Sequence, residues 1–222
     1  MTKYFLSLFI LLMMGLSLSA QRVKYNFNSA WQVYIGDDSS ASQVSFNDTD
    51  WKKVTLPYAW NEDDAFKKDI VDLRTGIAWY RKHFIIPAAH KGKKVFLEFE
   101  GIRQAGDFYI NGKHVGLHEN GAMAFGFDIT DHVVFGEDNV IAARINNDWD
   151  YREKATNTKF QWEDRNFNAN YGGITKNVFL HVTDKVYQTL PLYSNLKTTG
   201  VYIYAFNFNI KDRTAIIQAE SE

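Results

Sequence analysis

The sequence predicts an all-β protein, an antiparallel jelly-roll β-sandwich. Short segments of alternating apolar and polar residues recur along the chain, separated by Gly and Asn, which is typical of antiparallel strands joined by turns. The pair Asn111-Gly112 stands between two apolar segments and indicates a tight β-hairpin. After the first twenty residues no long segment repeats apolar side chains at the helical period. Many short strands are therefore expected to build the core.

The clearest predicted strand places Val95, Leu97 and Phe99 on one face. Because strand side chains alternate, we expect Glu98 and Glu100 on the opposite, solvated face. The other expected strands lie at 31–35, 54–56, 80–86, 108–115 (the two arms of the hairpin), 140–145 and 178–182.

The first residues predict a signal peptide. Lys3 precedes an almost wholly apolar segment, Tyr4 to Leu18, and Ala20 offers a small residue at the expected cleavage point. A membrane anchor is the alternative, but the apolar segment is shorter than the roughly 20 residues that cross a bilayer. We expect a mature chain that starts at Gln21, keeps no membrane anchor and is secreted, to the periplasm or the cell exterior.

Composition excludes several classes of protein. Hydrophobic residues make up 45% of the chain and aromatic residues 16%, which is enough for a core and argues against disorder. The net charge is −1, with no run of Lys or Arg, so a nucleic-acid partner is not expected. The absence of cysteine excludes disulfides, a lipid-anchored amino terminus and a thiol nucleophile.

Three parts are expected along the chain: a signal peptide at 1–20, a jelly-roll domain at 21–185, and a linker with the truncated start of a second β domain at 186–222. Because the pattern of a strand continues to the last residues, we expect the chain to be a fragment. Two weakly patterned segments, 61–76 and 148–173, interrupt the first domain, and long segments of this kind are often functional.

No residue pattern predicts an active site, a metal site or a cofactor site. Glu98 and Glu100 lie about 6.6 Å apart on a strand, close to the roughly 5–5.5 Å of a retaining glycosidase, but we expect them on a regular solvated face. His114 and His118 are about 13 Å apart along a strand, too far for one zinc ion. The segment Asn47–Asp50 begins like a calcium loop but is expected to be a turn.

A series of motifs nevertheless occurs in a specific order and spacing. The series includes Trp79-Tyr80-Arg81-Lys82, Tyr109-Ile110-Asn111-Gly112, Phe127-Asp128-Ile129-Thr130 and Tyr171-Gly172-Gly173-Ile174. It resembles the sugar-binding domain of glycoside hydrolase family two, the β-galactosidase and β-glucuronidase family, from about Phe27 to Asp184. In these motifs we expect one of Trp79 and Tyr80 in the core and the other on the surface, and Gly172-Gly173 where backbones approach closely.

The resemblance implies a galactose-binding-domain-like sandwich, followed by an immunoglobulin-like domain. It implies a retaining exo-glycosidase, β-galactosidase-like, that hydrolyses O-glycosyl bonds with two glutamates on a downstream barrel. The chain itself then holds no catalytic residue and is expected to be inactive alone. Its partners are the carbohydrate substrate and that barrel. Asn61 and Asp148 match the positions at which the family contacts the terminal sugar.

Other interpretations remain open from the sequence. Asn61 and Asp148 could simply cap turns. The chain could be a stand-alone carbohydrate-binding module, or a structural sandwich without a ligand. A module would stack sugars on aromatic side chains of a rigid face, whereas Trp60, Trp149, Tyr151 and Trp162 fall in or beside the two long loops. That position favours a surface completed by another domain.

Overall fold

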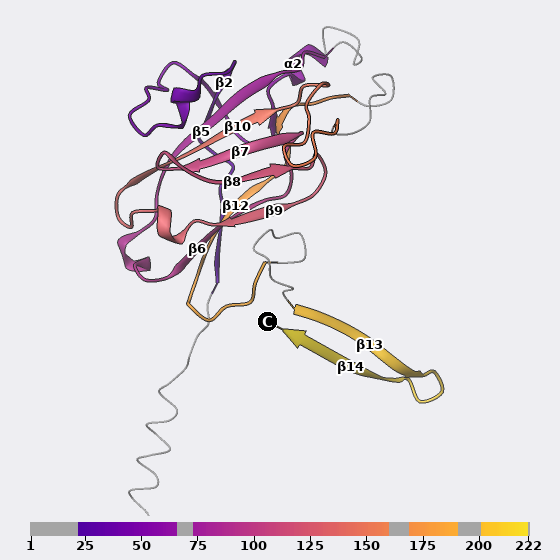
Figure 1. Ribbon diagram of the computed structural model, residues 1–222. Coiled ribbons are helices and arrows are strands. Elements are labelled where there is room, and N and C mark those ends of the chain that lie inside the picture. The colour runs from indigo at the N-terminus through magenta and orange to yellow at the C-terminus, as the bar shows by residue number, and fades with distance from the viewer. Residues whose placement is uncertain (1–21, 66–72, 160–168, 191–200, 222) are drawn as a thin grey trace, which may run out of the picture.

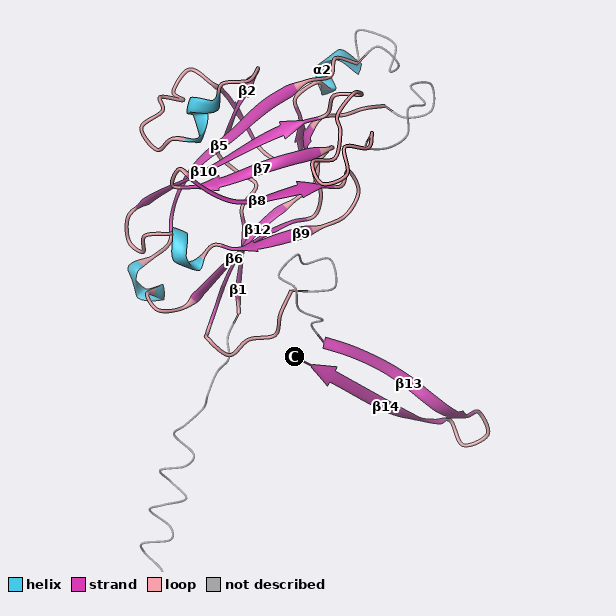
Figure 2. Cartoon of the chain, viewed as in Figure 1, coloured by secondary structure: helices cyan, strands magenta, loops and turns pink. Residues whose placement is uncertain are grey.

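The computed structural model describes residues 22–65, 73–159, 169–190 and 201–221, and these residues are almost entirely β (Figures 1 and 2). Their helical segments are a single turn, α2 (Glu62–Ala65), and the 3-10 turns η1 (Ser39–Ser42), η3 (Ala88–His90) and η4 (Thr130–His132). All pairings between strands are antiparallel. The predicted fold class, an antiparallel β-sandwich, is confirmed.

Two sheets form the sandwich. The four-stranded sheet has the order β1-β12-β6-β9, and the six-stranded sheet has the order β3-β2-β5-β10-β7-β8. The first sheet contains β1 (Val23–Asn26), β12 (Val178–Thr183), β6 (Lys94–Phe99) and β9 (Phe125–Asp128). The second contains β3 (Lys52–Val54), β2 (Trp31–Ile35), β5 (Ile77–Ile85), β10 (Asp138–Asn146), β7 (Ala105–Ile110) and β8 (Lys113–Glu119).

The chain crosses repeatedly from one sheet to the other, as in a jelly roll. Successive strands β5, β6 and β7 alternate between the sheets, and the first strand pairs with the last of the sandwich. In that pairing Val23 lies opposite Val182. A short ladder joins β4 (Tyr58–Ala59) to β11 (Gly173–Ile174) beside the main sheets.

Aromatic rings fill the space between the two sheets. Phe108 of β7 lies 4.8 Å from Phe99 and 5.1 Å from Phe127, both on the opposite sheet, and Phe99 stacks on Phe125 at 5.0 Å. All four side chains are buried, and each contributes about 1.5–3 kcal/mol by leaving water. The predicted inward face of Val95, Leu97 and Phe99 is confirmed by this core.

The predicted hairpin forms at Asn111-Gly112. The two residues join β7 to β8 with φ values of 50° and 79°, the left-handed geometry of a tight hairpin turn. The Asn111 amide also donates to the His132 carbonyl at 2.9 Å and accepts from the Val140 amide at 2.8 Å. One side chain therefore ties the turn to two other segments.

The expectation of a solvated face for Glu98 is wrong. Its side chain is only 6% exposed and accepts a hydrogen bond from His181 at 2.7 Å, with Lys24 at 3.1 Å. Residues 184–190 cover this outer face, where Tyr187 packs against Phe96 at 5.0 Å between ring centroids. A strand pattern shows which side chains share a face, but not what later covers that face.

The expectation that Trp79 and Tyr80 divide between core and surface is also wrong, because both are buried. Tyr80 faces the main core, whereas Trp79 lies in a second apolar cluster with Ala41 and Ala142 on the outer side of the six-stranded sheet. The segment 36–51 folds over that side. Within it the expected turn at Asn47–Asp50 is confirmed, and Asp48 of this turn has a further role.

A buried ion pair fastens the segment 36–51 to the sheet. Arg81 is fully buried, and its Nε donates to Asp48 Oδ2 at 2.8 Å. The same guanidinium donates to the carbonyls of Ala41 and Gln43 and lies 5.4 Å from the Phe46 ring centroid. Charge, hydrogen bonds and packing therefore act through one side chain.

The last described segment is a separate hairpin of β13 (Val201–Asn209) and β14 (Thr214–Ser221). Figure 1 shows it apart from the sandwich. Its apolar side chains Ile203, Phe208, Ile210 and Ile217 are exposed. The expected start of a second, immunoglobulin-like β domain in this part of the chain stays a prediction.

We expect Asp48→Asn to lower the free energy of unfolding by about 3 kcal/mol or more, because it leaves the Arg81 charge buried without a counter-ion. Urea denaturation measures the change. Asp63→Asn is the matched control, because Asp63 pairs with Lys52 at 3.3 Å with the two side chains 63% and 55% exposed. Its effect should stay under about 1 kcal/mol. Equal losses in the two variants would contradict the structural role of Arg81.

Candidate functional site

Three buried asparagines hold together the loops at one end of the sandwich. Asn61 follows β4, Asn147 follows β10, and Asn170 precedes β11. Their side chains are 0%, 0% and 1% exposed. Asn61 and Asn170 belong to the two segments that the sequence marked as weakly patterned, 61–76 and 148–173, and Asn147 directly precedes the second. The structure therefore brings these segments together.

The side-chain amide of Asn61 forms its hydrogen bonds with backbone groups. Its Nδ2 donates to the carbonyls of Arg74 at 2.7 Å and Asn170 at 2.9 Å. Its Oδ1 accepts from the Gly172 amide at 2.9 Å. Both amide hydrogens are therefore used within the domain, and Asn61 fixes the course of two loops.

Asn147 and Asn170 extend the same network. Asn147 donates to the Asn170 carbonyl at 3.0 Å and accepts from the Gly76 amide at 3.1 Å. Asn170 donates to the Asn147 carbonyl at 2.6 Å, and its Oδ1 accepts from Arg103 Nε at 2.9 Å. Loops without regular structure thus have their buried polar groups satisfied by side-chain amides, as burial requires.

The predicted close approach at Gly172-Gly173 is confirmed. A Cβ on Gly173 would overlap the Tyr80 hydroxyl, and a Cβ on Gly172 would overlap Asn147 and the Trp60 indole. Gly173 also has a φ of 121°, which side chains disfavour. The Tyr80 hydroxyl donates to the Tyr58 carbonyl at 2.9 Å, and burial raises the pKa of Tyr80.

Asp148 lies at this end of the sandwich, directly after Asn147, and is partly exposed. Its Oδ1 accepts from the Asp150 amide at 3.1 Å, and its carbonyl accepts from Gln104 Nε2 at 3.2 Å. These bonds fix the residue while the carboxylate keeps further acceptor capacity. The position suits a hydrogen bond from a ligand hydroxyl.

The aromatic residues expected around the loops have different positions. Trp60 is 4% exposed and belongs to the core, so it does not line a surface. Trp149 and Tyr151 are partly exposed. The Tyr151 hydroxyl donates to Glu119 at 2.6 Å, and burial together with that carboxylate raises the pKa of Tyr151. Trp162 lies outside the described residues.

The histidines considered as metal ligands have other partners. His114 lies 3.1 Å from Asp107. His118 stacks on Phe125 with ring centroids 3.7 Å apart, and burial lowers the pKa of His118 to about 4. In the described part of the chain no three His, Asp or Glu side chains gather as a metal ion would need.

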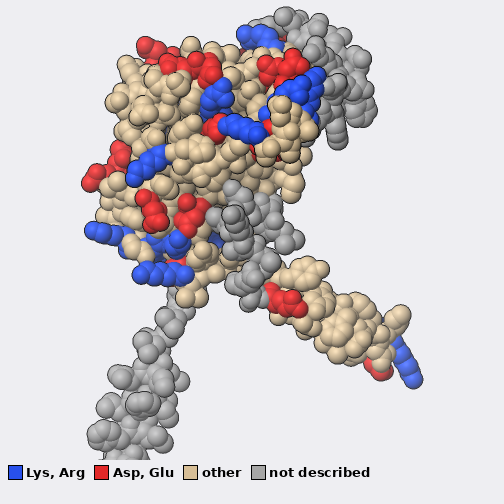
Figure 3. Space-filling view, in the orientation of Figure 1, with Lys and Arg blue, Asp and Glu red and all other residues tan. Residues whose placement is uncertain are grey.

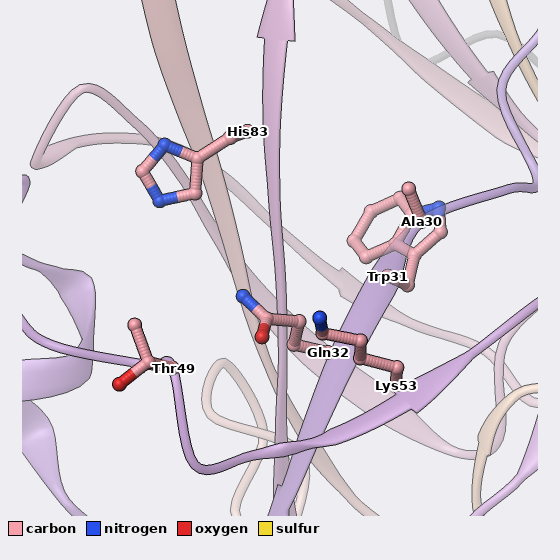
Figure 4. A pocket seen from close by; sticks show the side chains of 6 residues that line it. All are labelled: Ala30, Trp31, Gln32, Thr49, Lys53 and His83. Atoms are coloured by element: carbon pink, nitrogen blue, oxygen red, sulfur yellow. The ribbon is translucent and has the colours of Figure 1, made fainter.

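A cavity of about 410 Å³ lies elsewhere, on the outer side of the six-stranded sheet near β3 (Figure 4). It is lined by Ala30, Trp31, Gln32, Thr49, Lys53 and His83. His83 is opposite Val140 in the sheet, whereas the asparagine network is at the other end of β10, beyond Asn146. Because Trp31 is fully buried, the cavity offers no aromatic face for a sugar.

Sequence reasoning missed Asn147, Asn170, Arg103 and Gln104. The loops that hold the first two are rich in asparagine, which is a signal for side-chain satisfaction of loop backbone. Nothing in the pattern marks Arg103, whose partner is far along the chain.

The surface carries charges of both signs. In Figure 3 Lys and Arg are interspersed with Asp and Glu on the face in view, which agrees with the net charge of −1. In the residues that the structure describes, no helix is long and apolar enough to cross a membrane.

Comparison with known proteins finds consistent similarities. Residues 28–184 match the family described as glycosyl hydrolases family 2, sugar binding domain. A β-glucuronidase of Formosa agariphila is 42% identical over 213 residues, which is 92% of this chain and 21% of that protein. A β-galactosidase of Bacteroides ovatus is 33% identical over 59% of this chain and 16% of its own length.

Solved structures agree. A family 2 β-glucuronidase structure matches with a TM-score of 0.77 at 39% identity, over 91% of this chain and 22% of that one. A Bacteroides uniformis β-glucuronidase, covalently bound to cyclophellitol-6-carboxylate aziridine, matches with a TM-score of 0.71 at 28% identity over 83% of this chain and 20% of its own. The chain thus spans about a fifth of the length of these relatives.

We expect Asn61→Ala to lower the free energy of unfolding by about 3 kcal/mol, because the Gly172 amide and the Arg74 carbonyl lose their hydrogen bonds to Asn61, at about 1–3 kcal/mol for each unsatisfied group. The Asn170 carbonyl keeps its bond from Asn147. Thermal and urea unfolding measure the loss. Asn47→Ala is the control, because the exposed Asn47 accepts only from Thr49, in a turn. A loss under 1 kcal/mol for Asn61→Ala would show that the loops do not depend on it.

Proposed function

The chain belongs to glycosyl hydrolase family 2, whose sugar-binding domain it contains, and on this premise we propose that it is the sugar-binding part of a secreted, retaining exo-glycosidase. The substrates are O-glycosides of the β-galactoside or β-glucuronide kind. The observation that carries the proposal is the family match over 28–184, which contains every strand of the sandwich except β1.

The chemical step requires more chain than these 222 residues. A retaining mechanism needs two carboxyl groups about 5–5.5 Å apart and open to the sugar. Glu98 is covered and engaged by His181 and Lys24, and Glu100 accepts from Asn177 at 2.8 Å. Glu98 is thus covered, and Glu100 is already hydrogen-bonded within the sandwich. We therefore assign the catalytic glutamates to a downstream barrel, as the family resemblance implies.

Asp148 and Asn61 have different parts in the proposed site. Asp148 contacts a hydroxyl of the terminal sugar through its free acceptor positions. Asn61 has no amide hydrogen left to donate, so it acts chiefly by holding residues 170–172 in place beside Asp148. Its side chain is fully buried, so this role is one of positioning and not of direct contact with the sugar.

A stand-alone carbohydrate-binding module is the second candidate, and the described surface supports it less. Binding modules hold sugars against exposed aromatic faces. On the described part of the sandwich the tyrosines Tyr25 and Tyr34 are exposed, but Tyr34 is stacked on Trp51 at 5.4 Å. Trp31, Trp60 and Trp79 are buried. Micromolar binding of a polysaccharide by the chain alone would favour the module.

We expect residues 21–222 to show no turnover of 4-nitrophenyl β-galactoside or β-glucuronide, and a polypeptide that continues through the downstream barrel to hydrolyse at least one of them. In that longer enzyme Asp148→Asn should lower kcat/KM by about tenfold, because a charge-assisted hydrogen bond to the sugar is weakened.

Asp150→Asn is the matched control, since Asp150 lies two residues away with its side chain 79% exposed, and its kcat/KM should change less than about twofold. Turnover by the short chain, abolished by Glu98→Gln, would overturn the proposal. An unchanged kcat/KM for Asp148→Asn would remove Asp148 from the site.

We expect the secreted product to begin at Gln21, because the arrangement of Lys3, the apolar segment and Ala20 fits signal cleavage. These first residues lie outside the described part of the chain. The intact mass of the protein from the periplasm or culture medium tests this. A membrane-bound product that retains Met1 would contradict it.

A further inference from the structure

Glu119 holds the far end of the turn that carries Asp148. It is the last residue of β8. Its Oε1 accepts hydrogen bonds from the Tyr151 hydroxyl at 2.6 Å and from the Lys154 amide at 2.8 Å. These donors lie 32 and 35 residues further along the chain. Because β8 is an edge strand of the six-stranded sheet, one carboxylate oxygen joins the loop after Asp148 to the edge of that sheet.

Tyr151 connects this attachment to Asp148. The Tyr151 amide donates to the Asp148 carbonyl at 3.1 Å, which closes residues 148–151 into a tight turn. Inside the turn the Asp150 amide donates to Asp148 Oδ1 at 3.1 Å. The hydroxyl of Tyr151 is thus bonded to Glu119, and its amide is bonded to Asp148. A displacement of Tyr151 therefore changes the direction in which the Asp148 carboxylate points.

The start of the turn is fixed separately. The Asp148 amide donates to Asn146 Oδ1 at 2.8 Å, and the Asp148 carbonyl accepts a second bond from Gln104 Nε2 at 3.2 Å. Ala105, which follows Gln104, pairs with Glu119 in the β7–β8 ladder. The residues that hold the two ends of the turn, Gln104 and Glu119, are therefore anchored at the same end of one pair of strands.

The bond between Glu119 and Tyr151 is the strong part of this arrangement. A hydroxyl that donates to a carboxylate forms a bond of about 2.5–2.7 Å, roughly twice as strong as one between neutral groups, and the observed distance is 2.6 Å. Burial and the Glu119 carboxylate raise the pKa of Tyr151, so the phenol stays a donor. The next attachment of the loop, Lys154 to Asp107 at 3.0 Å, uses an ammonium group on a side chain 55% exposed and is expected to hold less firmly.

We propose that Glu119 is a positioning residue of the sugar site, which acts on Asp148 through Tyr151 and does not itself touch the ligand. The inference rests on the proposed sugar-binding function and adds to it a residue that works from a neighbouring strand. Glu119 holds the Tyr151 hydroxyl, Tyr151 closes the turn, and the turn directs the Asp148 carboxylate. Loss of Glu119 or of the Tyr151 hydroxyl therefore has its effect on sugar binding through Asp148.

The first test is a double-mutant cycle on kcat/KM in the polypeptide that continues through the downstream barrel, with the 4-nitrophenyl glycoside that it hydrolyses. Glu119→Ala should lower kcat/KM by about three- to tenfold, the range of one misplaced hydrogen bond. Glu119→Gln keeps an acceptor oxygen and should recover most of that loss. In an enzyme that already carries Asp148→Asn, Glu119→Ala should cost less than about twofold, because residues that act as one unit are not additive.

Amide hydrogen exchange of residues 21–222 measures the restraint without catalysis. The Tyr151 amide bonds to Asp148 and not to Glu119, so faster exchange in Glu119→Ala shows that the restraint is transmitted; we expect an increase of about fivefold or more. Glu153→Gln is the matched control. Glu153 lies in the same loop, but its carboxylate accepts from Thr156 at 2.7 Å within that loop. Exchange at Tyr151 and kcat/KM should then stay within about twofold of the wild type.

An additive cycle, in which Glu119→Ala costs the same factor with and without the Asp148 carboxylate, would overturn the proposal. Unchanged kcat/KM or unchanged exchange at Tyr151 in Glu119→Ala would overturn it as well. If Glu119→Ala does not fold, Tyr151→Phe removes the same hydrogen bond, keeps the ring, and must show the same coupling to Asp148. A longer polypeptide that hydrolyses no glycoside would refute the proposed function instead, and hydrogen exchange would still decide whether Glu119 holds the turn.

Discussion

One end of this sandwich depends on a single constraint. Buried polar groups there need hydrogen-bond partners although the regular sheet structure has stopped. Sheet hydrogen bonds end with β10 and β5, yet the loops beyond them are packed inside the domain. Asn61, Asn147 and Asn170 replace the missing ladder with amide bonds that join three segments. Because an unsatisfied buried group costs about 1–3 kcal/mol, the loops have little freedom to take another course.

The same device recurs at the opposite end. Asn139 accepts from the Val134 amide at 2.7 Å and donates to the carbonyls of Val134 and Glu137. Asn111 joins its own hairpin to β10. On the outer side of the six-stranded sheet, Arg81 likewise joins distant segments, through its ion pair with Asp48 and its hydrogen bond to the Gln43 carbonyl. Side chains that bond to distant backbone therefore complete a fold whose sheets are built by simple alternation.

Local patterns explain what the sequence could and could not predict. Alternation located most strands, and Asn111-Gly112 located the hairpin, because both depend on neighbouring residues alone. The burial of Glu98 and Trp79 depends on segments that fold over each sheet later, which no strand pattern contains. Asn61 and Gly172 are 111 residues apart in the sequence, so the hydrogen bond between them follows only from the complete fold. A sugar contact by Asp148 is expected from family resemblance and stays a prediction, whereas the hydrogen bond of Arg103 to Asn170 required the structure.

The pairing of the first strand with the last has a mechanical consequence. Val23 at the start of β1 lies opposite Val182 near the end of β12, so the chain enters and leaves the sandwich at the same point on the edge of one sheet. Hydrogen bonds between antiparallel strands run across the strands. A force that pulls the two ends apart would therefore load these hydrogen bonds one pair at a time and separate β1 progressively from β12. When the domain is held at both ends and placed under tension, the β1–β12 pair is therefore its mechanically weakest contact.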